Sequence, residues 1–131
     1  MAVRTALAAR NATLTAMVSR LANAVIRIYT GTQPATPETA ASGTLLAELT
    51  GNATFGTVSN GVLTANAITQ DASADATGAP GWARIFQSNG TTVEFDVAYT
   101  AGEFQLTGLV GGQIVAGGPV SLNELTYTLP M

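Results

Sequence analysis

The chain has 131 residues, with five Arg against eight Asp and Glu, a net charge of −3, and no His, Cys or Lys. Those three side chains carry out much of the nucleophilic, proton-transfer and metal-binding chemistry of proteins, so we expect no enzyme activity, no metal site and no cofactor. Without cysteine there are no disulfides, and a net-negative chain without basic clusters is a poor nucleic-acid binder.

The first segment predicts an amphipathic helix from residue 2 to about residue 22. The segment is rich in alanine, and leucines recur at intervals of seven. The stripe consists of Val3, Leu7, Arg10, Leu14, Met17 and Leu21. Unless a carboxylate meets Arg10, its guanidinium must reach solvent at the edge of the stripe. We expect the stripe to pack on a sheet, although three heptads also permit association between the helices of two copies.

Four of the five arginines lie within the first 27 residues. This asymmetry permits two interpretations, a contact with an acidic partner or subunit, or an ordinary solvated helix. Arg10 and Arg20 interrupt the apolar core that a signal peptide would need, and no stretch reaches the roughly 18 apolar residues of a membrane span. We therefore expect synthesis in the cytosol and no membrane partner.

After the helix the apolar period changes to two, which is typical of strands. The expected strands are Val25–Tyr29, Thr44–Thr50, Val62–Thr69, Trp82–Gln87, Thr91–Thr100, Phe104–Val110 and Val120–Leu129. Asn89-Gly90 predicts a tight hairpin turn because both residues tolerate positive φ. In the last run the apolar phase switches near Asn123, which indicates a β-bulge or a strand crossing between sheets.

These elements predict a mainly β protein, with an N-terminal α-helix followed by an antiparallel β-sandwich or jelly roll. We expect a single domain over residues 1–131, with the helix in residues 1–23 and the β-sandwich body in residues 24–131.

Residues 30–43 predict a long loop between the first two strands, because its prolines disfavour regular pairing. We expect this loop and the helical stripe to contact neighbouring molecules. The candidate contact residues of the loop are Gln33, Pro34 and Pro37.

Glu94 and Asp96 lie two residues apart on one face of an expected strand. General acid–base chemistry would require one raised pKa, and we expect instead a solvated outer face of a hairpin. Asp71 and Asp75 lack the alternating-oxygen spacing of calcium loops. Trp82 is expected to anchor the core, with an exposed binding role as the alternative.

Three segments resemble a family of small virion proteins of tailed bacteriophages, encoded among the head genes. The segments are MAVRTALAARNA, IRIYTGTQPATPETAASGTLLAELT and NGVLTANAITQDASADATGAPGWARIFQSNGTTVEFD. The resemblance implies a capsid decoration or cement protein, often a β-sandwich or jelly-roll homotrimer, that binds the major capsid protein on the outside of the phage head. It implies no catalytic or ligand-binding residue in this chain.

The composition is compatible with such a role but leaves others open. With 47% hydrophobic residues and 10% charged residues, the surface suits either contacts with copies and partners or an ordinary compact domain. An alternative function is a head-fibre or tail-associated module that contacts host carbohydrate, for which Trp82 or Tyr99 would supply the aromatic platform. A hydrolase that uses Glu94 and Asp96 is the least supported interpretation.

Overall fold

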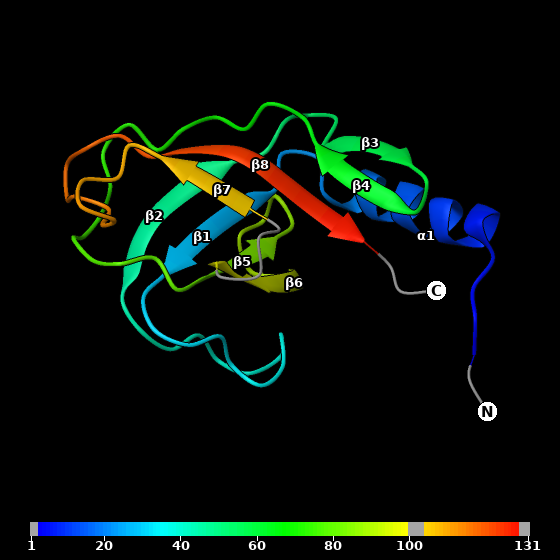
Figure 1. Ribbon diagram of the computed structural model, residues 1–131, viewed down its shortest axis with the longest axis horizontal. Helices are drawn as coiled ribbons and strands as arrows, with labels where there is room; N and C mark the ends of the chain where they lie inside the picture. Colours follow the sequence, from blue (N-terminus) through cyan, green and yellow to red (C-terminus); the bar gives the residue numbers. More distant parts are fainter. Residues whose placement is uncertain (1–2, 100–103, 129–131) are drawn as a thin grey trace.

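The chain forms one N-terminal helix followed by two antiparallel sheets, as the apolar periods predict. The structure is a computed structural model that describes residues 3–99 and 104–128. Its elements are α1 (Leu7–Arg20), β1 (Val25–Tyr29), β2 (Leu45–Thr50), β3 (Gly56–Ser59), β4 (Val62–Ala65), β5 (Trp82–Phe86), β6 (Val93–Ala98), β7 (Phe104–Thr107) and β8 (Ser121–Thr128). Figure 1 shows an elongated molecule, with α1 at one end and the connections of the sheets at the other.

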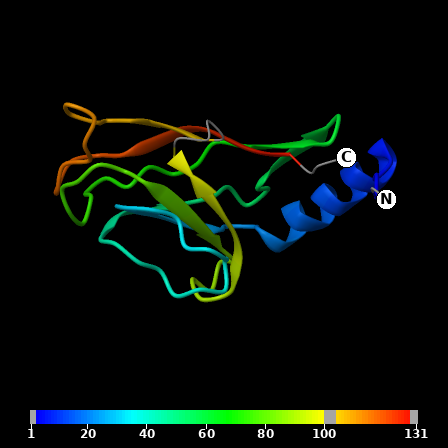
Figure 2. The same cartoon turned by 60° about the horizontal axis from the view of Figure 1, so that its bottom comes forward.

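Four hairpin pairs alternate between the two sheets. The first sheet has the order β2-β1-β5-β6, and the second has the order β3-β4-β8-β7. Each sheet therefore joins two sequential pairs through one central contact, between β1 and β5 or between β4 and β8. The result is a β-sandwich, in which the chain changes sheet after every second strand (Figures 1 and 2).

The core lies between the sheets, where alternate residues of each strand point inward. Ile26 and Ile28 of β1 face it, and they pair with Ile85 and Ala83 of β5. From the second sheet come Leu63, Val120, Leu122 and Leu125. The apolar positions that alternate in the sequence are therefore the ones that close the sandwich.

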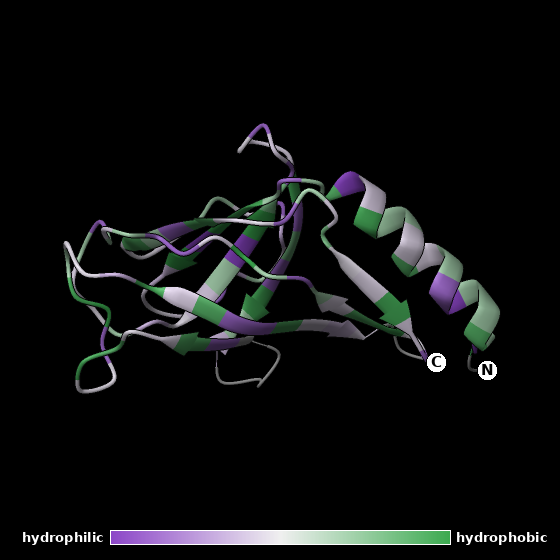
Figure 3. Cartoon of the chain, turned by 90° about the horizontal axis from the view of Figure 1, so that it is seen from above, coloured by the Kyte–Doolittle hydropathy of each residue, from purple (hydrophilic) through white to green (hydrophobic). Residues whose placement is uncertain are grey.

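Helix α1 covers β3 and β4 rather than standing apart from the sandwich. Leu14 and Leu21 are fully buried in the shared core. Asn11 joins α1 to the turn between β3 and β4, because its Oδ1 accepts a hydrogen bond of 2.8 Å from the amide of Gly61. The expectation that the apolar stripe packs on a sheet is confirmed, and Figure 3 shows α1 beside these strands.

The helix is shorter than the alanine-rich sequence predicts. It begins at Leu7 instead of residue 2, because the N-cap residue Ala6 has extended dihedral angles and offers no side chain to cap the free amides. It ends at Arg20, and Asn23 then takes a left-handed φ of 54° that turns the chain into β1. Residues 3–6 thus precede the helix.

Most strands lie where the alternation predicts them, but several bounds differ. Strand β7 ends at Thr107 rather than Val110, and β6 begins at Val93 rather than Thr91. Strand β3 was not predicted, because its short run contains Gly56 and only one large apolar residue, Val58. Strand β4 ends at Ala65 rather than Thr69, because the chain leaves the ladder and makes an isolated bridge between Thr50 and Thr69.

The bulge prediction is confirmed, and a turn lies where Asn89-Gly90 predicts one. Residues 88–90 turn between β5 and β6, but only Gly90 has a positive φ, of 71°, so the turn does not use the pair of positive φ angles on which the prediction was based. The β7–β8 register shifts so that Gln105 faces Glu124 and Leu106 faces Leu122. The extra residue is Asn123, which accounts for the change of apolar phase in β8.

We expect Leu14→Ala to lower the free energy of unfolding by about 2 to 5 kcal/mol, because it leaves a cavity between α1 and the sandwich. Leu7→Ala is the matched control on the same stripe, since Leu7 is 43% exposed and should change stability by only about 0.5 kcal/mol. Denaturant titration measures both. Equal losses for the two variants would contradict the packing of α1.

Candidate functional site

The outer face of the first sheet carries a row of four charged residues in register. Glu48 of β2 is paired with Arg27 of β1, Arg27 with Arg84 of β5, and Arg84 with Asp96 of β6. These residues occupy outward positions because their neighbours along each strand, such as Ile26 and Ile85, point into the core. One face of the sheet is therefore apolar, and the other carries a row of charges in the order acid, base, base, acid, with the two arginines next to each other.

The two ion pairs of this row have different surroundings. Arg84 holds Asp96 with two hydrogen bonds, Nε to Oδ1 at 2.8 Å and Nη2 to Oδ2 at 3.1 Å. Their side chains are only 4% and 1% exposed. Arg27 and Glu48 form a single bond of 2.8 Å and are 29% and 47% exposed. The outer half of the row is thus solvated, whereas the inner half is buried.

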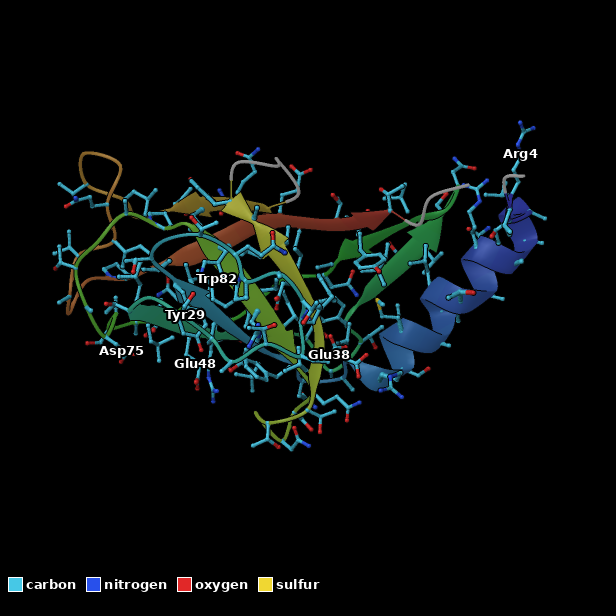
Figure 4. All side chains as sticks on the ribbon, turned by 90° about the horizontal axis from the view of Figure 1, so that it is seen from below. Arg4, Tyr29, Glu38, Glu48, Asp75 and Trp82 are labelled. Carbon is cyan, nitrogen blue, oxygen red and sulfur yellow. The ribbon has the colours of Figure 1, made fainter. Side chains whose placement is uncertain are left out.

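Aromatic rings enclose the arginines of the row. Trp82 stacks on Tyr29 with ring centroids 4.7 Å apart, and the guanidinium of Arg84 lies 5.0 Å from the Trp82 ring. Arg27 lies 4.7 Å from the ring of Phe86. All five residues of β5 are buried, because Ala83 and Ile85 face the core and these contacts cover the outward Trp82, Arg84 and Phe86. Figure 4 shows Tyr29 and Trp82 together on this side of the sandwich.

The loop of residues 30–43, which we call the strap, covers this face. Thr30 and Thr44 close its ends with backbone and side-chain hydrogen bonds of 3.0 and 2.9 Å. Where the strap begins, Gly31 passes so close to Gly81 that any side chain at residue 81 would overlap its carbonyl oxygen. Residues 37–40 then face Arg84 and Glu94 across a cavity of about 430 Å³. The strap therefore excludes most solvent from the inner ion pair.

The prediction of a solvated outer face at Glu94 and Asp96 is wrong. Their side chains are only 7% and 1% exposed, because the strap lies above them and an arginine meets each carboxylate. The error arises because strand alternation tells which residues face outward but not what covers them. Each carboxylate is ion-paired with its own arginine, Glu94 with Arg20 and Asp96 with Arg84, so the two do not act together as an acid–base pair.

Glu94 joins the end of α1 to the first sheet. Arg20 donates hydrogen bonds of 2.7 to 3.1 Å to both of its carboxylate oxygens, and Gln87 donates another of 2.6 Å. The hydrogen bonds from Arg20 lower the pKa of Glu94, against the opposing effect of burial, and Gln87 lowers it further. The same contact raises the pKa of Arg20. The helix is thus fixed to both sheets.

The helical stripe does not form a continuous contact surface. Leu14 and Leu21 lie in the core of their own chain at 0% exposure, which corrects their assignment as contact residues for another molecule. Arg10 and Met17 are half-buried, and Arg10 donates a hydrogen bond of 3.1 Å to the carbonyl oxygen of Thr5. Only Val3 at 84% and Leu7 at 43% remain exposed at the free end of the stripe.

The strap residues Gln33, Pro34 and Pro37 are half-buried against their own sheet. Gln33 lines a cavity of about 370 Å³ with Asp96 of β6 and with residues 126–128 of β8, and Pro37 lines the cavity above Arg84. Their main contacts are therefore internal. The surface that the strap offers to a partner consists of the exposed residues Ala35, Thr36, Glu38, Thr39 and Ala40.

Asp71 has a structural role, since its carboxylate accepts hydrogen bonds from the amides of Glu48 and Ser73. Among residues 3–99 and 104–128, no three acidic side chains gather as ligands for a metal ion. In the same part of the chain, no helix is long and apolar enough to cross a membrane. The buried Trp82 Nε1 makes no hydrogen bond, and it is the one such side-chain atom in the described residues.

The charged row was not predicted, although the alternation of apolar residues around its two arginines indicates that both face outward. Arg27 alternates with Ile26 and Ile28, which places it on the outward face, and Arg84 alternates with Ala83 and Ile85 in the same way. What the sequence does not give is the register that aligns the two arginines.

Comparison of the chain with protein families, with curated proteins and with solved structures finds no match.

We expect Asp96→Ala to cost about 3 to 5 kcal/mol of stability, because it leaves the charge of Arg84 buried without a partner. Glu48→Ala is the matched control at the other end of the row, and the solvated pair it breaks should contribute no more than about 1 kcal/mol. Thermal or denaturant unfolding measures both losses. A small effect of Asp96→Ala would show that the strap does not exclude solvent.

The Arg20–Glu94 contact predicts loss of stability in acid. A carboxyl whose pKa is lowered by folding stabilises the native state above its unfolded pKa of about 4.3, and this contribution disappears as the pH falls through the lower folded pKa. We therefore expect the stability of the wild-type chain to fall below about pH 4, and to fall less steeply in Glu94→Gln. Unfolding titrations at several pH values measure the slope. Identical slopes for both proteins would contradict the prediction.

Proposed function

We propose that the chain is a structural virion protein, a capsid decoration or cement protein. In this proposal it binds the major capsid protein on the outside of a phage head, as a homotrimer, and reinforces contacts between capsid subunits. The three segments that resemble small phage head proteins support the proposal, and they include both the strap and the β5–β6 hairpin. The chain would be made in the host cytoplasm and would act in the assembled particle.

The observation that carries the proposal is the way the charges are distributed. Three arginines, Arg20, Arg27 and Arg84, hold carboxylates within the body. Their ion pairs join α1 to β6, β1 to β2 and β5 to β6. Arg4 and Arg10 make no ion pair in the described residues. Arg4 lies before the start of α1 and points away from the sandwich (Figure 4), whereas the guanidinium of Arg10 lies beside Gly61 in the β3–β4 turn. A rigid body with a projecting contact segment suits a reinforcing role.

The exposed surface of the body is also compatible with this role. Small residues cover the outer side of the strap, so a partner can approach its backbone closely. Individual contacts of this kind are weak, but many copies on one lattice supply avidity without a large interface in any one copy.

No observation favours the alternative of a carbohydrate-binding module. Such sites present aromatic rings to solvent, whereas Trp82 is fully buried between Tyr29, Arg84 and the strap. Trp82 therefore anchors the fold, as expected, and Tyr99, the other residue named for this alternative, is partly buried against the core.

We expect the purified full-length chain to co-sediment with phage heads assembled from the major capsid protein of the same genome. Deletion of residues 3–6 should weaken this binding, because it removes the free end of α1 without touching the core residue Leu14. Glu124→Gln, an exposed change on β8, is the control and should bind normally.

Labelled antibody on intact particles locates the protein independently. Label on the head exterior would support the proposal. Label on the tail, or a chain that fails to co-sediment with heads, would contradict it.

A further inference from the structure

The large apolar side chains that remain exposed lie at opposite ends of the molecule. In the described part of the chain they are Val3, Leu7, Val110 and Val115. The first two belong to the N-terminal segment, and the other two belong to the loop between β7 and β8. Figure 1 shows these segments, in blue and orange, at the two ends of the long axis.

The first of these surfaces, the N-terminal end, consists of Val3, Arg4 and Leu7. Val3 is 84% exposed and Leu7 is 43% exposed. Arg4 is exposed and makes no ion pair or hydrogen bond within the described residues, and Figure 4 shows it pointing away from the body. Residues 3–6 are bonded to the helix, because Nε of Arg10 donates a hydrogen bond to the carbonyl oxygen of Thr5. This surface therefore combines two apolar groups with one free cation.

The second surface, the loop end, consists of Asp75, Val110 and Val115. Val110 is 67% exposed and Val115 is 39% exposed. The carboxylate of Asp75 is exposed and has no ion pair or hydrogen bond in the part of the chain that the structure describes. Figure 4 places Asp75 at the opposite end from Arg4. This surface combines two apolar groups with one free anion.

The loop end is fixed in place rather than loosely attached. Ile114, which lies between Val110 and Val115 in the sequence, is fully buried. Its backbone exchanges two hydrogen bonds with Gly78. Val110 and Gln113 bond each other reciprocally around Gly111 and Gly112, whose positive φ angles make the tight turn. A surface that is already ordered loses little entropy when a partner binds.

We propose that the N-terminal end of one copy binds the loop end of the next copy. The two ends match in chemistry, since each offers apolar side chains of similar size, and the free charges, Arg4 and Asp75, have opposite signs. Because the two surfaces differ, the contact is head-to-tail, and it repeats from copy to copy, to form a ring if its rotation closes and an open filament if it does not. Three copies in a closed ring would give the homotrimer proposed above, but the contact itself depends only on the two ends and not on capsid binding.

A second copy is favoured over another partner because both complementary surfaces are present on the same chain. Residues 3–23 carry only positive charges, Arg4, Arg10 and Arg20, whereas most acidic residues belong to the body. The charge asymmetry of the sequence thus matches the two ends of the fold. Like ends repel, which disfavours a symmetric contact between two N-terminal ends.

Sedimentation velocity of the purified full-length chain tests the contact without capsids. We expect concentration-dependent association that weakens at high salt. Arg4→Glu and Asp75→Arg should each weaken it at least about tenfold, since each places like charges in the interface. The double variant should restore it, because the charges are only exchanged. Glu124→Arg, an equal charge change away from both ends, is the control and should associate normally.

Mixing the two single variants separates a head-to-tail contact from damage to the fold. An equimolar mixture of Arg4→Glu and Asp75→Arg should associate, because every contact between unlike chains again joins opposite charges. The chain has no cysteine, so Val3→Cys mixed with Val110→Cys should yield a disulfide-linked heterodimer, whereas either variant alone should link poorly.

Three results would overturn the proposal: a wild-type chain that stays monomeric at all concentrations, a double variant or mixture that fails to associate, or cross-links between like ends only. Loss of capsid binding in a chain that still associates would count against the proposed function alone.

Discussion

The buried ion pair between Arg84 and Asp96 is the constraint on which the rest of the structure depends. Two charges removed from water are tolerated only when they are paired closely and hydrogen-bonded, and the two bonds of 2.8 and 3.1 Å meet this requirement. A slip of one residue between β5 and β6 would turn Arg84 into the apolar core. The pair therefore fixes the register of the hairpin, and with it the set of side chains that fill the sandwich.

The pair also explains the long strap and the residues around it. A central strand that is buried on both faces needs a cover outside the sheet, and the strap supplies it with only a few half-buried residues, such as Gln33 and Pro37. Gly81 has no side chain at the point where the strap crosses, and Trp82 and Tyr29 fill the space beside the guanidinium. The cost of this arrangement is the indole N–H of Trp82, which is buried without a partner.

The sequence predicted the layers of this protein better than its surfaces, and the reason is physical. Alternation of apolar residues is a local property, so the strands, the Asn89-Gly90 turn and the bulge at Asn123 could be predicted from short windows. Which outward residues are covered depends on contacts between distant segments. Asp96 and Gln33 of the strap line the same cavity although they are more than fifty residues apart, and no local pattern reports that they lie close together. The same limit applies to Leu14 and Leu21, whose stripe suited a partner helix as well as the chain's own sheet.

The distribution of free charge follows from the same packing. Arg20, Arg27 and Arg84 are held by carboxylates of the body, so the positive charge left over lies at the start of α1, while Asp75 remains free at the far end. An interior that pairs its charges across the sheet thus leaves an elongated molecule with opposite charges and apolar groups at its two ends. The two ends of such a molecule differ, so repeated contacts between unlike ends would assemble its copies in one orientation. Because the chain has no histidine, cysteine or lysine, the geometry of these contacts is the property of the fold that most directly suggests a role.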